Sequence, residues 1–389
     1  MLDTIEAIII LAAIDWSFLK QRPQHLAEAF ARRGSKVMFV ENTGVRTPRF
    51  SDWPRLLNRL HNFLQKAGHA VEKGQVTGVE VLSPLAMPFP YNPLSLAYNR
   101  RHVGGKIRRF LDQHHLSESQ TVFFSYLGTP LALAMADEFR WGSVVYDLVS
   151  DPKQVEPKLA PFEELFLQKA DLTLFTSATL CKAYGDQSAR SLLFRDGYNL
   201  GLLDCDDAIP DEVQRLSRPR FLYLGGINRK VDGDFLTSLA DAYPGGSIIL
   251  VGPVTPAEIT LPERPNVFLF PARSRYTEIA GYLRASDAAI IPYRADSYAG
   301  MMHPAKVNEY LVFGLPIIAT KTEELRHLEA ELGATNFYLA DSPGGFVMAA
   351  QRALAEDSPE RREARRALTR LNSWDGRAEK LTEIIVNGR

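Results

Sequence analysis

The residues best suited to chemistry lie between positions 290 and 318. In this segment an apolar run ends at Pro292, a loop of small residues follows, and a helical pattern begins at Pro304, since proline is favoured at the first position of a helix. Lys306 and Glu309 are three positions apart and therefore share one face of that helix. The lysine can bind a phosphate as a point charge, and the carboxylate can accept two hydrogen bonds from a ribose diol.

The loop that leads into this helix contains Gly300, Met301, Met302 and His303. The first backbone N–H groups of a helix have no partner within it, and the helix dipole makes that end attractive to anions. We therefore expect a diphosphate to bind at residues 301–303. His303 is a further candidate contact, and the alternative is an exposed or capping histidine.

A second group of candidate residues accompanies the apolar run 221–225. Gly225 and Gly226 allow the backbone to approach a ligand closely. Arg229 and Lys230 follow them, where their charges would neutralise a diphosphate and stabilise it as a leaving group. The alternative is an ordinary basic pair on the surface.

In the first half of the chain, the candidates follow the first apolar run, residues 6–14. Asp15, at the end of that run, is a candidate general base, although aspartate is also common in turns. Trp16 offers a flat face to a sugar. Arg22 and His25, at the start of the next helical pattern, suit an anionic or hydroxyl-rich ligand, and the alternative for Arg22 is a capping or surface role.

These candidates depend on elements that the hydrophobic pattern predicts along the whole chain. Short apolar runs alternate with helical patterns, which indicates parallel sheets built from βαβ units. The expected strands include residues 6–14, 143–148, 247–251, 267–270 and 288–292, and the expected helices include 22–33, 234–242 and 304–313. Residues 201–210 are acidic and lack this periodicity, so we place a domain boundary near position 205. Ligands of such sheets bind outside the carboxyl ends of the strands, where the candidates lie.

The chain has 389 residues, of which 46% are hydrophobic and 23% charged, which suits a globular protein of two α/β domains. Cys181 and Cys205 are too few for a disulfide framework, and no Cys or His spacing suggests a metal site. No apolar run approaches the roughly 20 residues that span a bilayer, and the first run lacks the basic leader of a signal peptide. These features predict a cytoplasmic protein.

The net charge of −1 conceals an uneven distribution. Residues 1–115 hold sixteen Lys and Arg against nine Asp and Glu, whereas the remainder holds 29 against 37. Two basic stretches in the first part, residues 53–66 and 99–110, have the pattern of amphipathic helices that lie on anionic membranes. The alternative is that their apolar faces pack on the sheet.

The pattern P-A-K-V-N-E-Y-L…G-L-P-I-I of residues 304–318 resembles the donor-site motif of retaining GT-B glycosyltransferases of group 1, or family 4. The resemblance implies that Glu309 holds the ribose of a nucleotide-sugar. A second glutamate, which often contacts the sugar in that family, is replaced here by Met301. Arg273 belongs to a loop that matches the place where family members hold the base.

Looser resemblances to the same family occur elsewhere in the chain. R-P-Q-H-L-A at residues 22–27 resembles the opening of the acceptor domain, and Y-D-L-V-S-D at 146–151 resembles a cluster whose first aspartate faces the cleft. On that basis Asp147 is a candidate to orient an acceptor hydroxyl or to accept its proton. Residues 373–389 resemble the closing helix that crosses back to the first domain.

We therefore predict an α/β protein of the GT-B class, in which two Rossmann-like domains face a central cleft. Residues 1–204 and 373–389 would form the acceptor domain and residues 205–372 the donor domain. The enzyme would transfer a sugar from a nucleotide diphosphate, with UDP expected and GDP and dTDP open, to a saccharide or lipid-linked acceptor in cell-surface polysaccharide or glycoconjugate synthesis. No metal, other cofactor or nucleic acid is expected. Its location would be cytoplasmic, with peripheral binding to the inner face of the membrane as a further expectation.

Two other functions fit the same pattern. A nucleotide-sugar epimerase or hydrolase would use the donor site without an acceptor, and a non-catalytic nucleotide-sugar-binding protein would account for Met301. The chain lacks the P-loop pattern G-x-x-x-x-G-K-[ST], which excludes a P-loop NTPase. It also lacks G-x-G-x-x-G after the first strand, which disfavours a dehydrogenase.

Overall fold

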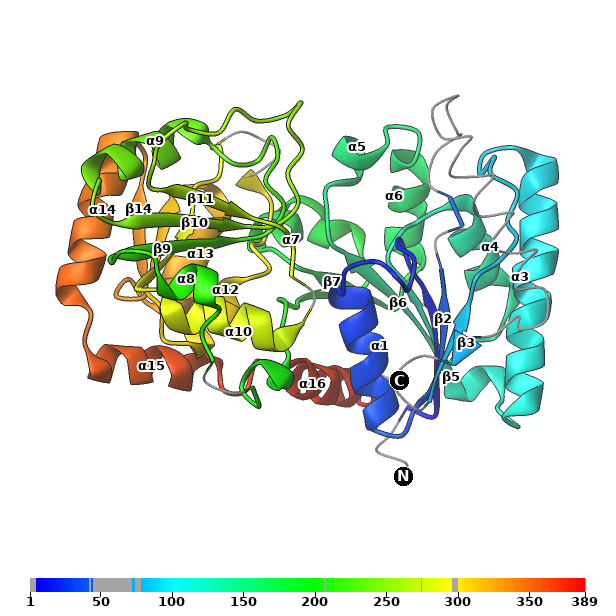
Figure 1. Ribbon diagram of the computed structural model, residues 1–389. Helices are drawn as coiled ribbons and strands as arrows, with labels where there is room; N and C mark the ends of the chain where they lie inside the picture. The colour runs from blue at the N-terminus through cyan, green and yellow to red at the C-terminus, as the bar shows by residue number, and fades with distance from the viewer. Residues whose placement is uncertain are drawn as a thin grey trace. The chain divides into compact units, whose positions relative to one another are not determined.

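The computed structural model describes residues 5–41, 43–44, 78–205, 208–273, 275–295 and 300–388, and the backbone of residues 72–73. The chain forms two compact units, one made of Met1–Arg195 with Asp375–Arg389 and the other of Asp196–Trp374 (Figure 1). The second unit thus begins at position 196, ahead of the linker from which we placed the boundary near 205. Each unit contains one sheet.

The first unit has an eight-stranded sheet with the order β3-β4-β2-β1-β5-β6-β7-β8. All neighbouring strands are parallel except the two-residue β3, which is antiparallel to β4. The central strands are buried along their whole length, as expected for a sheet covered on both faces. The strands are β1 (Ala7–Leu11), β2 (Lys36–Val40), β3 (Glu72–Lys73), β4 (Val79–Leu82), β5 (Thr121–Ser125), β6 (Ser143–Leu148), β7 (Leu172–Phe175) and β8 (Ser191–Leu193).

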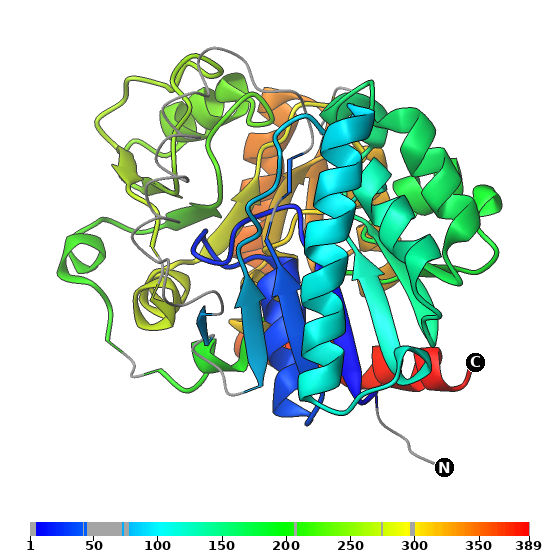
Figure 2. The same ribbon diagram turned by 90° about the vertical axis from the view of Figure 1, so that its right-hand side faces the viewer.

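Helices cover both faces of this first sheet. Helix α1 lies on one face, and α3 lies on the other, where it contacts α4 (Figures 1 and 2). The helices of the unit are α1 (Arg22–Arg32), α3 (Pro93–Gln113), α4 (Pro130–Glu138), α5 (Pro152–Val155), α6 (Ala160–Lys169), α7 (Ala178–Tyr184) and α16 (Trp374–Val386).

Helix α16, at the end of the chain, packs on the first unit. Leu381 and Ile385 are buried, Asp375 pairs with Arg32 of α1 at 2.7 Å, and Arg190 donates a hydrogen bond to the carbonyl oxygen of Ile384. Exposed ion pairs such as the first contribute at most about 1 kcal/mol, so apolar burial holds the helix in place. The predicted return of the chain end to the first domain is confirmed.

The second unit has a six-stranded sheet, parallel throughout, with the order β11-β10-β9-β12-β13-β14. Figure 1 shows α9 and α14 on one face of it and α10 and α12 on the other. The strands are β9 (Arg220–Leu224), β10 (Ser247–Val251), β11 (Val267–Phe270), β12 (Ala288–Ile291), β13 (Ile317–Thr320) and β14 (Phe337–Ala340). The helices are α8 (Asp211–Gln214), α9 (Gly233–Ala242), α10 (Tyr276–Ala285), α12 (Val307–Val312), α13 (Glu323–Leu332), α14 (Pro343–Glu356) and α15 (Pro359–Thr369).

In both sheets the order in which the chain adds strands reverses once. The point of reversal indicates where a ligand can bind. In the second sheet the chain runs outward from β9 to β11 and then returns to place β12 on the other side of β9. In the first sheet β5 lies beside β1 in the same way. At such a switch point the loops that follow the two central strands diverge and leave a crevice at their carboxyl ends. The predicted pair of Rossmann-like sheets is therefore confirmed.

Residues 99–110, one of the two stretches with a possible membrane-binding pattern, lie within α3. Their apolar side chains Val103, Ile107 and Phe110 are buried, so this face packs within the unit, as the alternative interpretation held. The other stretch, residues 53–66, lies outside the described residues. In the part of the chain that the structure describes, no helix is long and apolar enough to cross a membrane.

The ends of β9 and β10 approach each other at Gly225 and Gly252. Both glycines have positive φ angles, +144° and +156°. A Cβ atom on Gly252 would lie 1.9 Å from the carbonyl oxygen of Gly225, so no side chain fits there. This close contact fixes the turn from which the loop after β9 departs.

Gly252→Ala should therefore lower the free energy of unfolding by about 2–4 kcal/mol, because the new methyl group overlaps Gly225 and the positive φ is unfavourable for alanine. Gly245→Ala is the matched control, since nothing lies within 4 Å of a Cβ atom at that position. Thermal unfolding followed by calorimetry measures both. Equal stability of the two variants would contradict the contact.

Candidate functional site

The loops after β9 and β12 meet at the switch point of the second sheet. Val231 and Tyr293 form an antiparallel bridge between them. The N–H of Asp232 donates to the carbonyl oxygen of Pro292, and the N–H of Arg294 donates to that of Lys230, both at 2.8 Å. The loop that carries Gly225, Gly226 and Lys230 is therefore fixed to the chain that leaves β12.

Tyr310 connects this pair of loops to α12. Its hydroxyl oxygen accepts a hydrogen bond of 2.8 Å from the N–H of Leu224, the last residue of β9. Burial raises the pKa of the Tyr310 hydroxyl well above its usual value, so the group stays neutral. Residues on the first turn of α12 are thereby held next to the end of β9.

Two further tyrosines lie beneath the same loops. The Tyr223 hydroxyl donates to the carbonyl oxygen of Gly226 at 2.9 Å, and burial raises its pKa as well. The Lys230 ammonium lies 5.3 Å from the centroid of the Tyr293 ring, a cation–π distance. Of the two predicted basic residues, Lys230 therefore lies against Tyr293 at the end of β12, whereas Arg229 is exposed.

Glu309 is the residue before Tyr310 and is only 8% exposed. Lys306 donates a hydrogen bond of 2.8 Å to its Oε1 atom. Its Oε2 atom is buried and has no hydrogen-bond partner among the described residues. Leaving a buried polar atom unpaired costs on the order of 1–3 kcal/mol, and a ligand hydroxyl that donates to this oxygen would remove that cost.

Helix α12 begins at Val307, so the predicted start at Pro304 is wrong. Residues 305–306 form a turn, in which the N–H of Val307 bonds the carbonyl oxygen of Pro304 at 3.1 Å. The N–H groups of residues 301–303 are therefore not the first turn of this helix, as the predicted phosphate site required. Gly300 is helical, and Met301 and Met302 lie in the turn and loop that follow it; all three are partly buried.

The imidazole of His303 is buried, at 2% exposure, so the alternative of an exposed histidine is wrong. Its Nδ1 atom lies 3.8 Å from Oε1 of Glu324, a fully buried residue of α13. The loop before α12 is therefore anchored by a side chain that points into the unit. His303 offers its backbone, rather than its ring, to solvent.

Arg273, the candidate contact for a base, takes part in a network with α8 and α10. It donates to Oε1 of Glu212 at 2.7 Å and to the hydroxyl of Tyr282 at 3.2 Å. The Tyr282 hydroxyl also donates to Glu212, and its pKa is raised to about 12, with burial as the largest cause. This network holds the loop after β11 in place.

In the first unit, Arg22 and Asp147 form a buried ion pair. Arg22 Nε donates to Asp147 Oδ2 at 2.7 Å, and Nη2 donates to the carbonyl oxygen of Phe194 at 2.8 Å. Asp147 is fully buried, so it has no exposed atom with which to take a proton from an acceptor. Breaking a buried pair of this kind costs about 3–5 kcal/mol. The pair therefore ties α1 to β6 and accounts for both residues structurally.

Asp15, Trp16 and His25 lie near the carboxyl end of β1 and are half-buried. The Trp16 ring packs edge-on against Phe39, with 4.9 Å between the ring centroids. Its backbone N–H donates to Oε1 of Glu41 at 2.7 Å. The structure thus brings these three predicted residues to one edge of the sheet, with the indole held by β2.

Two further aspartates of the first unit have structural roles. Asp151 caps α5, accepting a hydrogen bond from the N–H of Lys153, and it also accepts one from the Tyr184 hydroxyl at 2.6 Å. Asp171 accepts one from the N–H of Val144 at 2.7 Å, which joins the starts of β6 and β7.

Glu163 of α6 is a titratable group that the sequence did not single out. It is 2% exposed, and burial raises its pKa to about 8, while a hydrogen bond from the N–H of Gly128 opposes the shift. A Cβ atom on Gly128 would lie 2.8 Å from the Cα atom of Glu163, so α6 directly contacts the loop after β5. Glu163 therefore lies beside the switch point of the first sheet.

Within the described ranges, no group of three or more His, Cys, Asp or Glu side chains is arranged to hold a metal ion. Lys230 and Lys306 both contribute positive charge near the switch point of the second sheet.

The chain is similar over its whole length to solved glycosyltransferase structures. One is sucrose-phosphate synthase from Thermosynechococcus elongatus, with 16% identity, a TM-score of 0.67 and 98% of both chains covered. Another is HepE of Anabaena in complex with UDP, with 14% identity, a TM-score of 0.62, and coverage of 98% of this chain and 100% of that one. Together with the two switch-point sheets and the returning α16, these likenesses define the chain as a protein of the GT-B fold, as predicted.

At the level of sequence, no protein-family model matches the chain. It is similar to the putative teichuronic acid biosynthesis glycosyltransferase TuaH of Bacillus subtilis (strain 168), with 22% identity over 277 residues, which are 65% of this chain and 68% of that protein. The predicted resemblance to GT-B glycosyltransferases is thereby confirmed.

The pKa of Glu163 gives a prediction about stability. Between pH 4.5 and about 8 the unfolded chain releases the proton of this carboxyl group while the folded chain keeps it, so stability should fall as the pH rises through this window. Glu163→Gln abolishes this titration and keeps an acceptor for the N–H of Gly128. Its melting temperature should therefore fall less than that of the wild type, by several degrees.

The measurement is a series of thermal melts from pH 5 to 8. Glu164→Gln, at the exposed neighbouring position, is the control and should follow the wild type. Parallel curves for the wild type and Glu163→Gln would rule out a raised pKa at Glu163.

Proposed function

We propose that the chain is a glycosyltransferase that takes its sugar from a UDP-sugar. The observation that carries the proposal is the buried Oε2 atom of Glu309, beside Lys306 at the switch point of the second sheet, which has no hydrogen-bond partner in the part of the chain that the structure describes. In this proposal Glu309 accepts hydrogen bonds from the ribose diol, and the second unit is the donor domain.

The diphosphate would bind between the loop after β9 and the start of α12. Lys306 and Lys230 place positive charge on either side of that position, and Gly225 and Gly226 let the backbone come close to the phosphates. As the bond between the anomeric carbon and the diphosphate oxygen breaks, these charges stabilise the leaving group, with Arg229 available from the exposed part of the loop. Because side chains supply this charge, we propose transfer without a metal ion and, by family resemblance, with retention of configuration.

The first unit would bind the acceptor. Asp15 is the remaining candidate to receive the proton of the acceptor hydroxyl, and Trp16 and His25 are candidates to contact the acceptor. Asp147 would act through Arg22, as a residue that positions α1. The names of the similar proteins support a UDP-linked donor and a saccharide or lipid-linked acceptor of cell-surface polysaccharide synthesis, since one is assigned to teichuronic acid biosynthesis and another was solved with UDP. This proposal places the enzyme in the cytoplasm.

Glu309→Ala should weaken the binding of UDP by about 1–3 kcal/mol, because the ribose loses its charged acceptor. Isothermal titration calorimetry measures this directly. Glu331→Ala, at an exposed position of α13, is the matched control and should bind UDP like the wild type. Unchanged affinity in Glu309→Ala would count against the donor site.

Product analysis with UDP-sugars then separates the possible reactions. Transfer only in the presence of a saccharide or lipid-linked acceptor is the expected result. Turnover without an acceptor would instead favour a nucleotide-sugar hydrolase or epimerase. Tight UDP binding with no turnover of any donor would favour a non-catalytic nucleotide-sugar-binding protein.

We also propose that the outer face of α3 binds an anionic membrane surface. Arg101 and Arg109 are exposed there, Lys106 is half-buried between them, and Leu94 and Tyr98 near the start of the helix are exposed as well. Since the apolar face of α3 is packed within the unit, the attraction would be mainly electrostatic.

Replacing Arg101, Lys106 and Arg109 together by glutamine should weaken binding to liposomes that contain anionic lipid by roughly 100-fold, because each basic residue near such a surface contributes about 1 kcal/mol. Co-sedimentation at low and high salt measures this, and salt should weaken binding by the wild type. A triple variant at exposed arginines of the second unit is the control. Absence of wild-type binding at low salt would end the proposal.

A further inference from the structure

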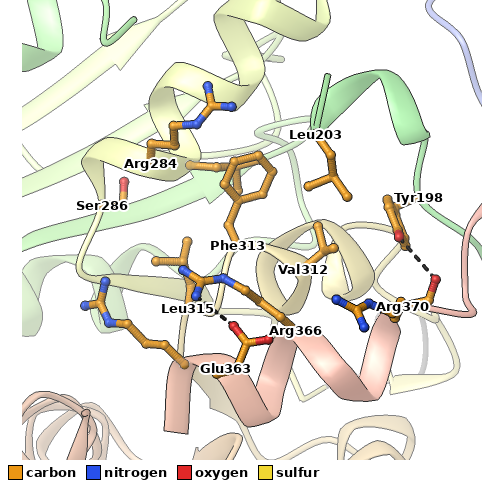
Figure 3. A pocket seen from close by; sticks show the side chains of 12 residues that line it. Tyr198, Leu203, Arg284, Ser286, Val312, Phe313, Leu315, Glu363, Arg366 and Arg370 are labelled. Atoms are coloured by element: carbon orange, nitrogen blue, oxygen red, sulfur yellow. Dashed lines mark hydrogen bonds and ion pairs between the residues drawn. The ribbon is translucent and has the colours of Figure 1, made fainter. Parts of the chain in front are cut away.

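A cavity of about 480 Å³ lies in the second unit, away from the candidate donor site (Figure 3). All its lining residues belong to Asp196–Trp374. Ser286 and Leu315 line it, and they lie two positions before the first residues of β12 and β13. The cavity is therefore at the amino ends of these parallel strands, whereas Gly225 and Tyr293 follow carboxyl ends.

The cavity wall carries an excess of positive charge. Glu363 is its single lining carboxylate, and it pairs with Arg366 at 3.2 Å on an exposed turn of α15, where such pairs are weak. Four arginines line the same space: Arg284, Arg362, Arg366 and Arg370. A concave surface with several like charges concentrates the electrostatic field and attracts counter-ions of opposite charge.

Two of these arginines, Arg284 and Arg370, line the cavity from different parts of the unit. Arg284, at the end of α10, donates to the carbonyl oxygen of Cys205 at 2.8 Å and lies 5.5 Å from the centroid of the Phe313 ring. Arg370 follows α15, and within the described residues no hydrogen bond or ion pair engages its guanidinium group. Its backbone carbonyl oxygen accepts a hydrogen bond from the buried Tyr198 hydroxyl, which fixes the position of the residue.

The remainder of the wall is largely apolar. Figure 3 shows Val312, Phe313 and Leu315 between Arg284 on one side and Arg366 and Arg370, which rise from the α15 region, on the other. Arginine forks bind phosphate groups through paired charged hydrogen bonds, and an apolar wall favours the organic part of a ligand. The volume falls within the roughly 300–1,000 Å³ that is typical of small-molecule sites.

We propose that this cavity binds a phosphorylated small molecule of the sugar phosphate or polyol phosphate type. Its phosphate group would contact Arg366 and Arg370, and its carbon skeleton would lie against Phe313 and Val312. The site goes beyond the proposed donor function, since none of its residues takes part in UDP binding. It nevertheless contacts α12, the helix that bears Glu309 on its opposite end.

Helix α12 is connected to the cavity wall by a buried hydrogen bond and by close packing. Buried Arg365 of α15 donates a hydrogen bond of 3.0 Å to the carbonyl oxygen of Gly314, in the turn that ends α12. Gly314 has a φ of +77°, and a Cβ atom on it would lie 3.0 Å from atoms of Arg362. Helix α15, which supplies two of the four arginines, is therefore packed directly on the end of α12.

The test is calorimetric titration of the full chain with glucose 6-phosphate, ribose 5-phosphate and glycerol 3-phosphate at constant ionic strength, with and without saturating UDP. At least one should bind with a Kd below about 1 mM, and inorganic phosphate at least ten-fold more weakly, because it lacks the carbon skeleton. Arg366→Gln and Arg370→Gln should each weaken this binding roughly ten-fold through loss of a charged hydrogen bond. Arg352→Gln, an exposed position on α14, is the matched control.

Each outcome bears on the proposal. Both arginines are exposed, so the variants should melt with the wild type, and thermal unfolding checks this. The proposal is overturned if none of the three phosphates binds, if neither arginine variant weakens binding, or if Arg352→Gln weakens it equally. Displacement of the sugar phosphate by UDP would also overturn it, since binding would then be at the donor site. Sugar phosphate binding by a chain that does not bind UDP would instead refute the proposed function and leave this site standing.

Discussion

The hydrogen bond from the N–H of Leu224 to the Tyr310 hydroxyl is the interaction on which the candidate donor site depends. Helix α12 has only six residues, too few to be stable by itself in water. The buried Tyr310 ring and its hydrogen bond give it a fixed place beside β9. Glu309 precedes Tyr310 in the chain, so its carboxylate is held at the edge where β9 and β12 diverge. A ligand that binds there meets a preformed acceptor.

The two units use similar residue types in different ways. In the second unit, Lys306 occupies one oxygen of Glu309 and leaves the other unpaired among the described residues. In the first unit, the guanidinium of Arg22 donates hydrogen bonds to Asp147 and to the carbonyl oxygen of Phe194. The side chains of Lys306 and Glu309 are 36% and 11% exposed, so a ligand can reach this pair. Those of Arg22 and Asp147 are 6% and 0% exposed, so that pair stabilises the fold. Burial and pairing, rather than residue type, separate the two cases.

Much of the fold could be predicted from the sequence, because a fully buried parallel strand is a continuous apolar run with clear ends. The fully buried strands β6 and β10 have the expected bounds, and so does the partly buried edge strand β11. The start of α12 could not be predicted, since Pro304 suits a turn as well as a first helical position, and its carbonyl oxygen bonds Val307 instead of opening the helix.

The contacts between side chains within the candidate sites were harder to predict from the sequence. Arg22 and Asp147 are 125 positions apart, and nothing in either local pattern indicates that they meet. Glu163 and Glu164 are adjacent and chemically alike, and only the direction in which α6 faces buries one of them. Tyr310 stood within the donor motif, but its role depends on a strand some 86 positions earlier.

The return of α16 to the first unit determines the order in which the two units can finish folding. Arg32 and Asp375, which pair across α1 and α16, are separated by 343 positions. The second unit is one continuous stretch, so it leaves the ribosome whole while α1 still lacks its partner helix. Domains of a growing chain generally fold from the amino end onward. Here the first unit is begun before the second and finished after it, and its surface under α16 stays uncovered until α16 has been synthesised.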